Sequence, residues 1–280
     1  MQEAAYEDKC FLLSTRCAEE SNRIGARFVE LSTGHVYDHG SKQSKEDGKI
    51  KPWTKQAACK LRAEEAIRGM DGLRWTVLRL AYVYGVGDVS SVVMQRLVCA
   101  PIYKHLGETM KFLWTGNLKT NTVHVIDAVR AAWHVATNDA ALHKTYNVVD
   151  RSETDQGKIN VFLEEIFGIK TGFQGTAMSS IACKMSMSNV VSEVNDKHMQ
   201  PWMDLCKADN VANTPLSPYM YKELLHNWPL SMDGSALCAE TGFEYLVPEM
   251  TTARVREVLD AAIKQRIFPS SGEATAEAQQ

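Results

Sequence analysis

The feature that most constrains the fold is an almost unbroken apolar run over residues 75–84, WTVLRLAYVY. The glycine-rich turn GVGD follows it directly and ends it. A strand that is apolar on both faces is typical of a parallel sheet covered by helices on both sides. The run therefore predicts a buried parallel strand, and any fold proposed for the chain must place a helix on each side of it.

Helical and strand patterns alternate on either side of this run. Helical spacing of apolar residues, with start and stop signals, predicts helices over residues 2–23, 52–69, 126–137, 158–167, near 183–196 and over 252–266. Short apolar runs predict further strands over residues 27–31, 122–125 and 145–149. Helices and strands in this order indicate an α/β fold with a doubly wound parallel sheet.

The composition argues against several kinds of partner. A net charge of −3 over 280 residues leaves no basic excess for nucleic acid, and no apolar stretch reaches the length of a membrane span. The acidic start MQEAAYEDK lacks the pattern of a signal peptide, so we expect a cytoplasmic protein. The seven cysteines are scattered without a C-x-x-C pair, and we expect no metal site.

Five segments carry a more specific signal because they occur in a fixed order. They are RFVELSTGHVYD, PWTKQAACKLRAEEAI, WTVLRLAYVYGVGD, TVHVIDAVRAAWHVA and TYNVVD. In this order they resemble the motifs of the extended short-chain dehydrogenase/reductases, the NAD-dependent epimerase/dehydratase family. The resemblance runs from about residue 5 to residue 168, and GFEYLVPEMTTARVREVLDAAI is similar to the family's C-terminal end.

The resemblance implies a Rossmann-like doubly wound sheet with a smaller C-terminal lobe of the substrate-binding type. We accordingly expect a partial NAD(P)-binding-type domain over residues 1–150, with residues 89–120 inserted into the second lobe. A C-terminal lobe over residues 151–269 and a disordered tail over residues 270–280 complete the expected organisation.

The family's fold opens with a strand, a G-x-x-G-x-x-G turn and a helix whose N-terminus binds the pyrophosphate. None of the 17 glycines of this chain forms that motif. The resemblance therefore implies that the sheet lacks its first strands, and we expect cofactor binding by this chain to be weakened or lost.

The resemblance also assigns candidate site residues. Thr33 aligns with the family's Ser or Thr that hydrogen-bonds the reacting oxygen, and Lys60 aligns with the lysine of the Tyr-x-x-x-Lys pair. Lys60 and Tyr82 are the candidate contacts to the cofactor, NAD or NADP. The implied substrate is a nucleotide sugar or a small carbonyl compound, and a homodimer through residues 52–69 is implied as well.

Gln56 occupies the position four residues before Lys60, where the family has its catalytic tyrosine. A tyrosine whose pKa is lowered by the lysine passes a proton while hydride moves to or from nicotinamide, whereas an amide does not ionise near neutral pH. Loss of such general acid–base catalysis costs about 10²–10⁴-fold in rate. The nearest residue that titrates in the useful range is His35, which we consider as a replacement catalyst.

These residues also have structural interpretations, which the sequence leaves open. Thr33 at a strand end is equally suited to cap the following turn, and His35 to form a hydrogen bond within a loop. Lys60 is equally suited to pair with Glu64 one helical turn later.

Aromatic and acidic residues near these motifs have structural alternatives too. Tyr82, Tyr84 and Trp53 are compatible with a sugar pocket, but aromatic side chains beside a buried strand more often belong to the core. Asp127, with Arg130 one turn later, is expected to cap its helix rather than to act in catalysis.

Three hypotheses about function remain. The favoured one is a catalytically impaired relative that serves as a binding or scaffold module. The second is a working NAD(P)-dependent nucleotide-sugar epimerase, dehydratase or carbonyl reductase whose N-terminal part is missing from this chain. The third is a divergent enzyme with another acid–base group, in which a partner chain completes the sheet.

Overall fold

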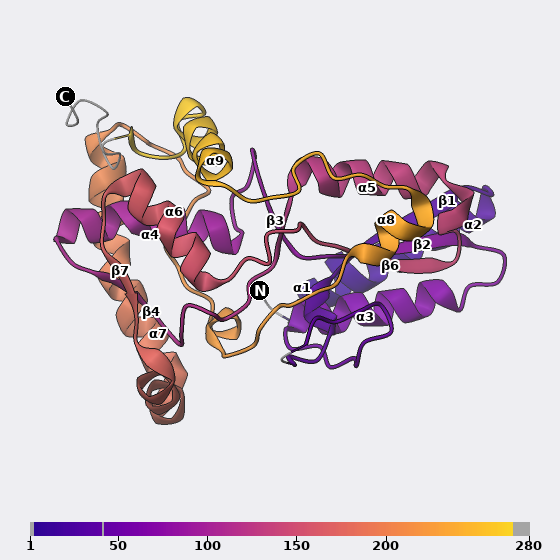
Figure 1. Ribbon diagram of the computed structural model, residues 1–280, viewed down its shortest axis with the longest axis horizontal. Coiled ribbons are helices and arrows are strands. Elements are labelled where there is room, and N and C mark those ends of the chain that lie inside the picture. The colour runs from indigo at the N-terminus through magenta and orange to yellow at the C-terminus, as the bar shows by residue number, and fades with distance from the viewer. Residues whose placement is uncertain (1–2, 41, 271–280) are drawn as a thin grey trace. The chain divides into compact units, whose positions relative to one another are not determined.

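The computed structural model describes residues 3–40 and 42–270, and it divides into two compact units (Figure 1). The first unit contains residues 1–83, 121–153 and 229–249. The second contains residues 84–120, 154–228 and 250–280. Each unit is described by itself below.

The first unit is built on a parallel sheet with the strand order β1-β2-β6. The strands are β1 (Arg27–Thr33), β2 (Arg74–Leu80) and β6 (Lys144–Val148). The register pairs Leu31 with Leu78 and Leu78 with Tyr146. This confirms the predicted α/β class and parallel sheet, and it places β1 at one edge of the sheet.

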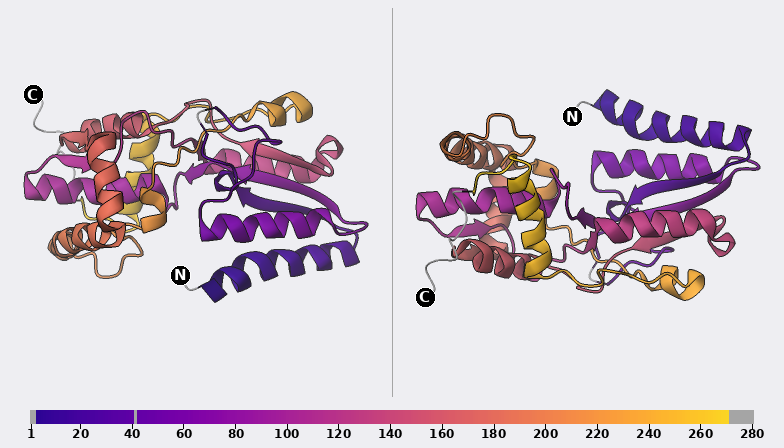
Figure 2. Two further views of the ribbon diagram at one scale, coloured as in Figure 1. Left: turned by 90° about the horizontal axis from the view of Figure 1, so that it is seen from below. Right: turned by 90° about the horizontal axis from the view of Figure 1, so that it is seen from above.

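Helices cover both faces of this sheet. One face carries α3 (Lys55–Arg68) with α2 (Leu13–Arg23) beside it, and the other face carries α5 (Val125–Thr137) (Figure 2). α2 is preceded by α1 (Glu3–Tyr6) and the π-helix η1 (Glu7–Leu12). Two 3-10 helices and a short helix complete the unit: η2 (Gly34–Val36), η3 (Asp139–Ala141) and α8 (Ser235–Thr241).

Local capping explains where the two main helices of this unit begin. The Thr54 side chain accepts the backbone N–H of Ala57 at the start of α3, and the His124 ring accepts the backbone N–H of Ile126 at the start of α5. The hydroxyl of Thr54 thus starts α3 three residues after the expected start at residue 52.

The predicted strand over residues 75–84 is divided into β2 and a second strand, β3 (Tyr82–Tyr84). The reason is a change of partner. The backbone N–H of Ala81 still donates to the carbonyl of Val148, the last residue of β6, whereas that of Tyr82 donates to the carbonyl of Asn121. β3 forms a separate two-stranded sheet with β5 (Thr122–His124).

The second unit is mainly helical. Its elements are α4 (Val92–Leu106), β4 (Met110–Phe112), α6 (Gln156–Phe167), β7 (Thr171–Phe173), α7 (Gly175–Ala208), η4 (Lys222–Leu225) and α9 (Thr252–Lys264). β4 and β7 pair in parallel, and one hydrophobic core joins α4, α6, α7 and α9. Gly107 and Gly168, both with positive φ, end α4 and α6 in the left-handed conformation.

Three expectations differ from the structure or lie outside it. The helix expected near residues 183–196 is part of the 34-residue α7, because its polar and methionine-rich surface obscured the helical pattern in the sequence. Residues 229–249, expected in the C-terminal lobe, lie in the first unit. Residues 271–280 of the expected tail lie outside the described residues. No helix of the described residues is long and apolar enough to cross a membrane.

Candidate functional site

Thr33 is the last residue of β1, at the carboxyl end of the sheet where ligands of open α/β folds bind. Its side-chain oxygen accepts the backbone N–H of His35 at 3.3 Å and so caps η2. Its backbone is extended, so the strand continues to this residue before the turn begins. The contact that the structure gives Thr33 is therefore the turn cap that we considered as its structural alternative.

His35 lies between two aromatic side chains. Its ring centroid is 4.3 Å from that of Trp53 and 4.9 Å from that of Tyr82, with Tyr82 edge-on. Burial among these rings lowers the pKa of His35 to about 4. The imidazole is consequently neutral near pH 7 and lacks the acidic proton of an imidazolium, which makes it a poor replacement for a general acid.

Gln56 and Lys60 lie one turn apart on α3 but have different surroundings. Gln56 is exposed, in the first turn of the helix. The side chain of Lys60 reaches the sheet, where its Nζ donates to Oε1 of Glu30 at 2.8 Å. The same carboxylate oxygen accepts the hydroxyl of Ser14 at 3.2 Å, and only 4% of the Glu30 side chain is exposed. The expected alternative pairing of Lys60 with Glu64 is therefore wrong.

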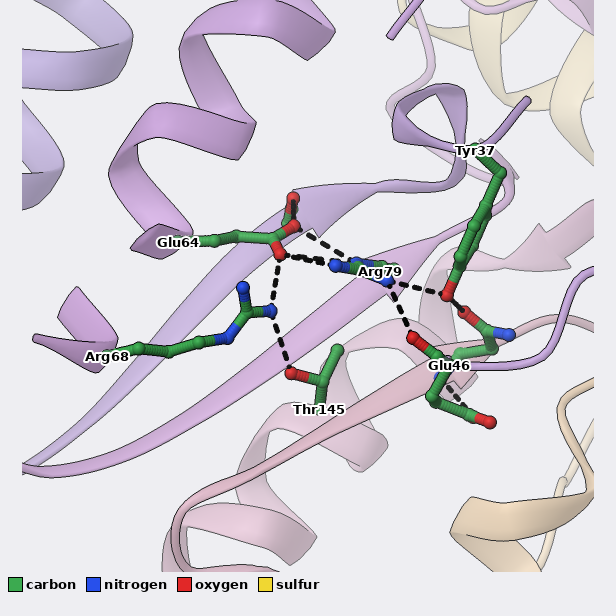
Figure 3. A network of polar contacts seen from close by, with 8 residues as sticks. Tyr37, Glu46, Glu64, Arg68, Arg79 and Thr145 are labelled. Carbon is green, nitrogen blue, oxygen red and sulfur yellow. Dashed lines mark hydrogen bonds and ion pairs between the residues drawn. The ribbon is translucent and has the colours of Figure 1, made fainter. Parts of the chain in front are cut away.

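Glu64 is instead the centre of a buried polar network (Figure 3). Its carboxylate accepts Nη2 of Arg79 at 2.8 Å and Nη2 of Arg68 at 2.6 Å, and it also accepts the hydroxyl of Ser32. Arg68 donates further to Thr145 at 3.0 Å. A single carboxylate on α3 thus binds side chains of β1, β2 and its own helix, and Arg68 extends the network to β6.

The network continues through Arg79 to the aromatic end of the site. Nη1 of Arg79 donates to the hydroxyl of Tyr37 at 2.9 Å, and that hydroxyl donates to Oδ1 of Asn147 at 2.7 Å. Burial raises the pKa of Tyr37 to about 12, although Arg79 opposes the shift. Asn147 also donates to the backbone oxygens of Ser44 and Asp233, so Tyr37 is held as a neutral phenol in a fully bonded setting.

The structure brings some of the predicted site residues together and separates others. Thr33, His35 and Tyr82 meet at the carboxyl end of β1, whereas Lys60 is bonded to the middle of the same strand. Sequence reasoning missed Glu30 as the partner of Lys60. The available signal was a lone glutamate inside the apolar run RFVEL, because an acid buried in a strand requires a partner.

Asp127 has a structural role in the first unit. Its carboxylate accepts the backbone N–H groups of Leu246 and Val247, both at 2.7 Å, and pairs with Arg130 at 2.9 Å. The side chain thus anchors a distant segment rather than capping its own helix. Among the described residues no group of three or more His, Cys, Asp or Glu side chains is placed to hold a metal ion.

A protein-family model matches about half of the chain. The model of the NAD dependent epimerase/dehydratase family matches residues 2–149, which include Thr33, Gln56, Lys60 and Tyr82. No curated protein sequence matches the chain.

Solved structures share the fold at low sequence identity. UDP-glucuronic acid 4-epimerase from Bacillus cereus, in complex with UDP-glucuronic acid and NAD, has 15% identity and a TM-score of 0.62, with 91% of this chain and 67% of that chain covered. dTDP-glucose 4,6-dehydratase from Bacillus anthracis, in complex with NAD, has 14% identity and a TM-score of 0.63, with 97% and 73% covered.

A third structure is a UDP-N-acetylglucosamine 4-epimerase from Methanobrevibacter ruminantium in complex with UDP-N-acetylmuramic acid. It has 15% identity and a TM-score of 0.62, with 94% of this chain and 71% of that chain covered. All three are longer than the part that this chain matches, and the likeness establishes the Rossmann-like fold.

Proposed function

The chain belongs to the NAD dependent epimerase/dehydratase family, and on that premise we propose that it is a catalytically impaired member that binds a nucleotide sugar without oxidising or reducing it. The proposal has two parts, the loss of proton and hydride transfer and the retained ligand class. They depend on different observations and are tested separately.

The state of the Tyr-x-x-x-Lys position carries the first part. An exposed glutamine amide stands at position 56, and the Lys60 ammonium is bonded to Glu30 at 2.8 Å. A lysine promotes proton transfer here by lowering the pKa of a neighbouring phenol and by binding the cofactor. With no phenol at position 56 and a carboxylate bound to its ammonium, Lys60 serves instead to fix α3 on β1.

The other titratable groups near this position do not supply the missing acid or base. The pKa of His35 is lowered to about 4, and that of Tyr37 is raised to about 12. A general acid–base catalyst works best with a pKa near the operating pH. Both groups are therefore several pH units from the useful range, in opposite directions.

The ligand class follows from the family and from its solved members. The neighbouring structures hold UDP-glucuronic acid, UDP-glucose or UDP-N-acetylmuramic acid, and several hold NAD. We propose a nucleotide sugar as the ligand of this chain, and NAD or NADP as a ligand that these 280 residues bind with lower affinity, because no G-x-x-G-x-x-G motif occurs among them.

A titration of thermal unfolding tests the binding part. Purified protein is heated with UDP-glucose, UDP-glucuronic acid, NAD⁺ or NADP⁺, and a ligand at a hundred times its Kd adds about 2.7 kcal/mol to the free energy of unfolding. A UDP-sugar is expected to raise the Tm more than either dinucleotide. A cooperative transition that no UDP-sugar shifts would contradict this part.

A turnover assay tests the catalytic part. Protein with a UDP-sugar and NAD⁺ or NADP⁺ is expected to give neither reduced nicotinamide nor an isomerised sugar. The variant Gln56→Tyr restores the phenol, and Gln56→Phe is its matched control without a hydroxyl. Turnover by the unmodified chain would overturn the proposal in favour of a working enzyme.

The homodimer through residues 52–69 also remains a proposal. One flank of α3 is already occupied within the chain, because Arg62 pairs with Glu7 at 2.7 Å and lies over the ring of Phe11. A dimer would therefore use the opposite flank of α3. Sedimentation of the variant Gln56→Lys, compared with that of Arg62→Ala, would show which flank of the helix forms the dimer.

A further inference from the structure

Two buried side chains of α7 hold the segment of residues 217–221. The side-chain amide of Asn195 accepts the backbone N–H of Met220 at 2.7 Å and donates to the backbone oxygen of Met220 at 3.4 Å. His198 lies one turn later and so on the same side of the helix, and its ring bonds to the backbone oxygen of Pro218. Asn195 and His198 are 6% and 1% exposed, so this attachment is closed to solvent.

The ring of His198 also contacts two side chains of α4. Its Nε2 lies 3.1 Å from the hydroxyl oxygen of Tyr103, and its Nδ1 lies 4.0 Å from Sγ of Cys99. The rings of Tyr103 and His198 pack edge to face, with their centroids 5.4 Å apart. His198 therefore joins α4, α7 and the segment 217–221 at one buried point of the second unit.

The uncharged neighbours of His198 do not neutralise a proton on its ring. Burial raises the pKa of Tyr103 and that of Cys99 to about 12, so both groups stay neutral near pH 7. The backbone oxygen of Pro218 supplies only a dipole. Among the described residues, no carboxylate forms a hydrogen bond or an ion pair with the His198 ring. A protonated ring is therefore a buried charge without a counter-charge, which is costly.

The charged side chains around this point add to that cost. Lys197 precedes His198 on α7, and Arg96 stands on α4 and acts on the thiol there. Glu108 is already paired with Lys197. Burial lowers the pKa of His198, the bond to the backbone oxygen of Pro218 opposes this shift, and Lys197 adds to it. The buried site therefore favours the neutral ring.

We propose that His198 is an acid-sensitive latch, which holds the segment 217–221 on α4 and α7 when it is neutral and releases the segment when it takes up a proton. A neutral imidazole donates from one nitrogen and accepts at the other, which suits a backbone oxygen on one side and a hydroxyl or thiol on the other. An imidazolium has no acceptor and carries a charge that this site does not balance. The released state therefore binds the proton first as the pH falls below about 6.5, the usual histidine pKa. This inference concerns the second unit alone and is independent of the proposed function.

Hydrogen exchange of the whole protein between about pH 7.5 and about pH 5.5 tests the latch, with rates corrected for the intrinsic pH dependence of exchange. If release binds one proton and the latched ring stays neutral, the open population rises about tenfold over this interval. The amides of residues 190–206 of α7 and the backbone N–H of Met220 are accordingly expected to exchange about tenfold faster at the lower pH. Exchange that does not accelerate in the unmodified protein would overturn the proposal.

Histidine variants separate the latch from other titrating groups. His198→Gln keeps a donor and an acceptor but does not titrate in this range, so it is expected to abolish the acceleration. His105→Gln, at an exposed histidine of α4 in the same unit, is the matched control and is expected to retain it. If His198→Gln does not fold, the imidazole NMR signal of His198 in the unmodified protein decides, and it is expected to titrate below about pH 6.5. Acceleration that persists in His198→Gln, or a His198 signal that titrates at or above that pH, contradicts the latch.

Discussion

The two helices that cover the central sheet differ in how much charge they bury against it. α3 buries Ala57, Ala63 and Ile67 on one face and adds charged and polar contacts, Lys60 with Glu30 and Glu64 with Arg79 and Ser32. α5 lies on the other face through small apolar side chains, which are Ala128, Ala131 and Val135. Both helices are close to the same strands, so the difference lies in their residues and not in their position.

The contrast shows what each kind of contact contributes. Apolar packing is non-directional and is stabilising in proportion to the area buried. A buried ion pair contributes little net stability, because desolvation offsets most of the attraction, but removal of one partner is strongly destabilising. The polar contacts therefore fix the position and rotation of α3 on the strands. The apolar contacts of α5 stabilise the unit but tolerate small changes in position.

Among the predictions, removal of Glu64 is expected to change the free energy of unfolding most. The variant Glu64→Ala leaves Arg79, which is 3% exposed, without its carboxylate and should lower the free energy of unfolding by about 3–5 kcal/mol. Urea unfolding followed by circular dichroism measures it. Glu65→Ala, on the exposed side of the same helix, is the control and should change stability by less than about 0.5 kcal/mol. Similar losses in both variants would show that the network has no special role.

The apolar face should respond more weakly to one truncation. Val135 of α5 is fully buried. The variant Val135→Ala should lower the free energy of unfolding by about 2–3 kcal/mol, because it loses transfer energy and leaves a cavity. Val129→Ala, on the exposed flank of the same helix, should cost well under that amount. If Val135→Ala were more damaging than Glu64→Ala under the same urea conditions, the comparison drawn here would be reversed.

His35, which is packed between Trp53 and Tyr82, should make stability depend on pH. Because the pKa of His35 is about 4 when folded and about 6.5 when unfolded, the unfolded state binds the proton first as the pH falls. The contribution is complete above pH 6.5 and is lost as the pH falls toward 4. Between pH 7 and 5 the loss should be about 2 kcal/mol. His35→Phe keeps the aromatic packing without titrating, so its unfolding free energy should fall by about that much less over the same interval.

The ion pair of Lys60 should show the smallest effect. A double-mutant cycle with Glu30→Gln and Lys60→Met is expected to give a coupling energy of about 1 kcal/mol, because the lysine is partly exposed while the glutamate is buried. The same cycle run between Lys60 and Glu64 should give a value near zero. A larger coupling to Glu64 would return Lys60 to the pairing expected from the helix alone.

Much of the fold could be predicted from local patterns. The run at residues 75–84 and the alternation of helices and strands indicated the parallel sheet, and α6 and α9 were predicted to within about two residues of their observed ends. α7 was the main underestimate, since its methionine, asparagine and serine residues give a weak apolar face. Local patterns work where one face of an element is clearly apolar.

The candidate site could be predicted only in part. Thr33, His35 and Tyr82 were singled out from their places after strands, and they do meet. The partner of Lys60 was missed: the lone glutamate in the apolar run RFVEL signalled that Glu30 needs a partner, but which lysine or arginine reaches it depends on how α3 lies on β1. The same holds for Glu64, whose pairing with Arg68 is visible as a spacing of four, but whose pairing with Arg79 is not.

The sequence by itself determined the α/β class, the parallel sheet and the family, because each depends on residue order and on apolar periods along the chain. Only the tertiary structure decided which charges meet inside the first unit and that residues 229–249 belong to that unit. The physical reason is that such contacts join residues tens of positions apart. They come within bonding distance only through strand register and helix rotation, which local sequence patterns do not specify.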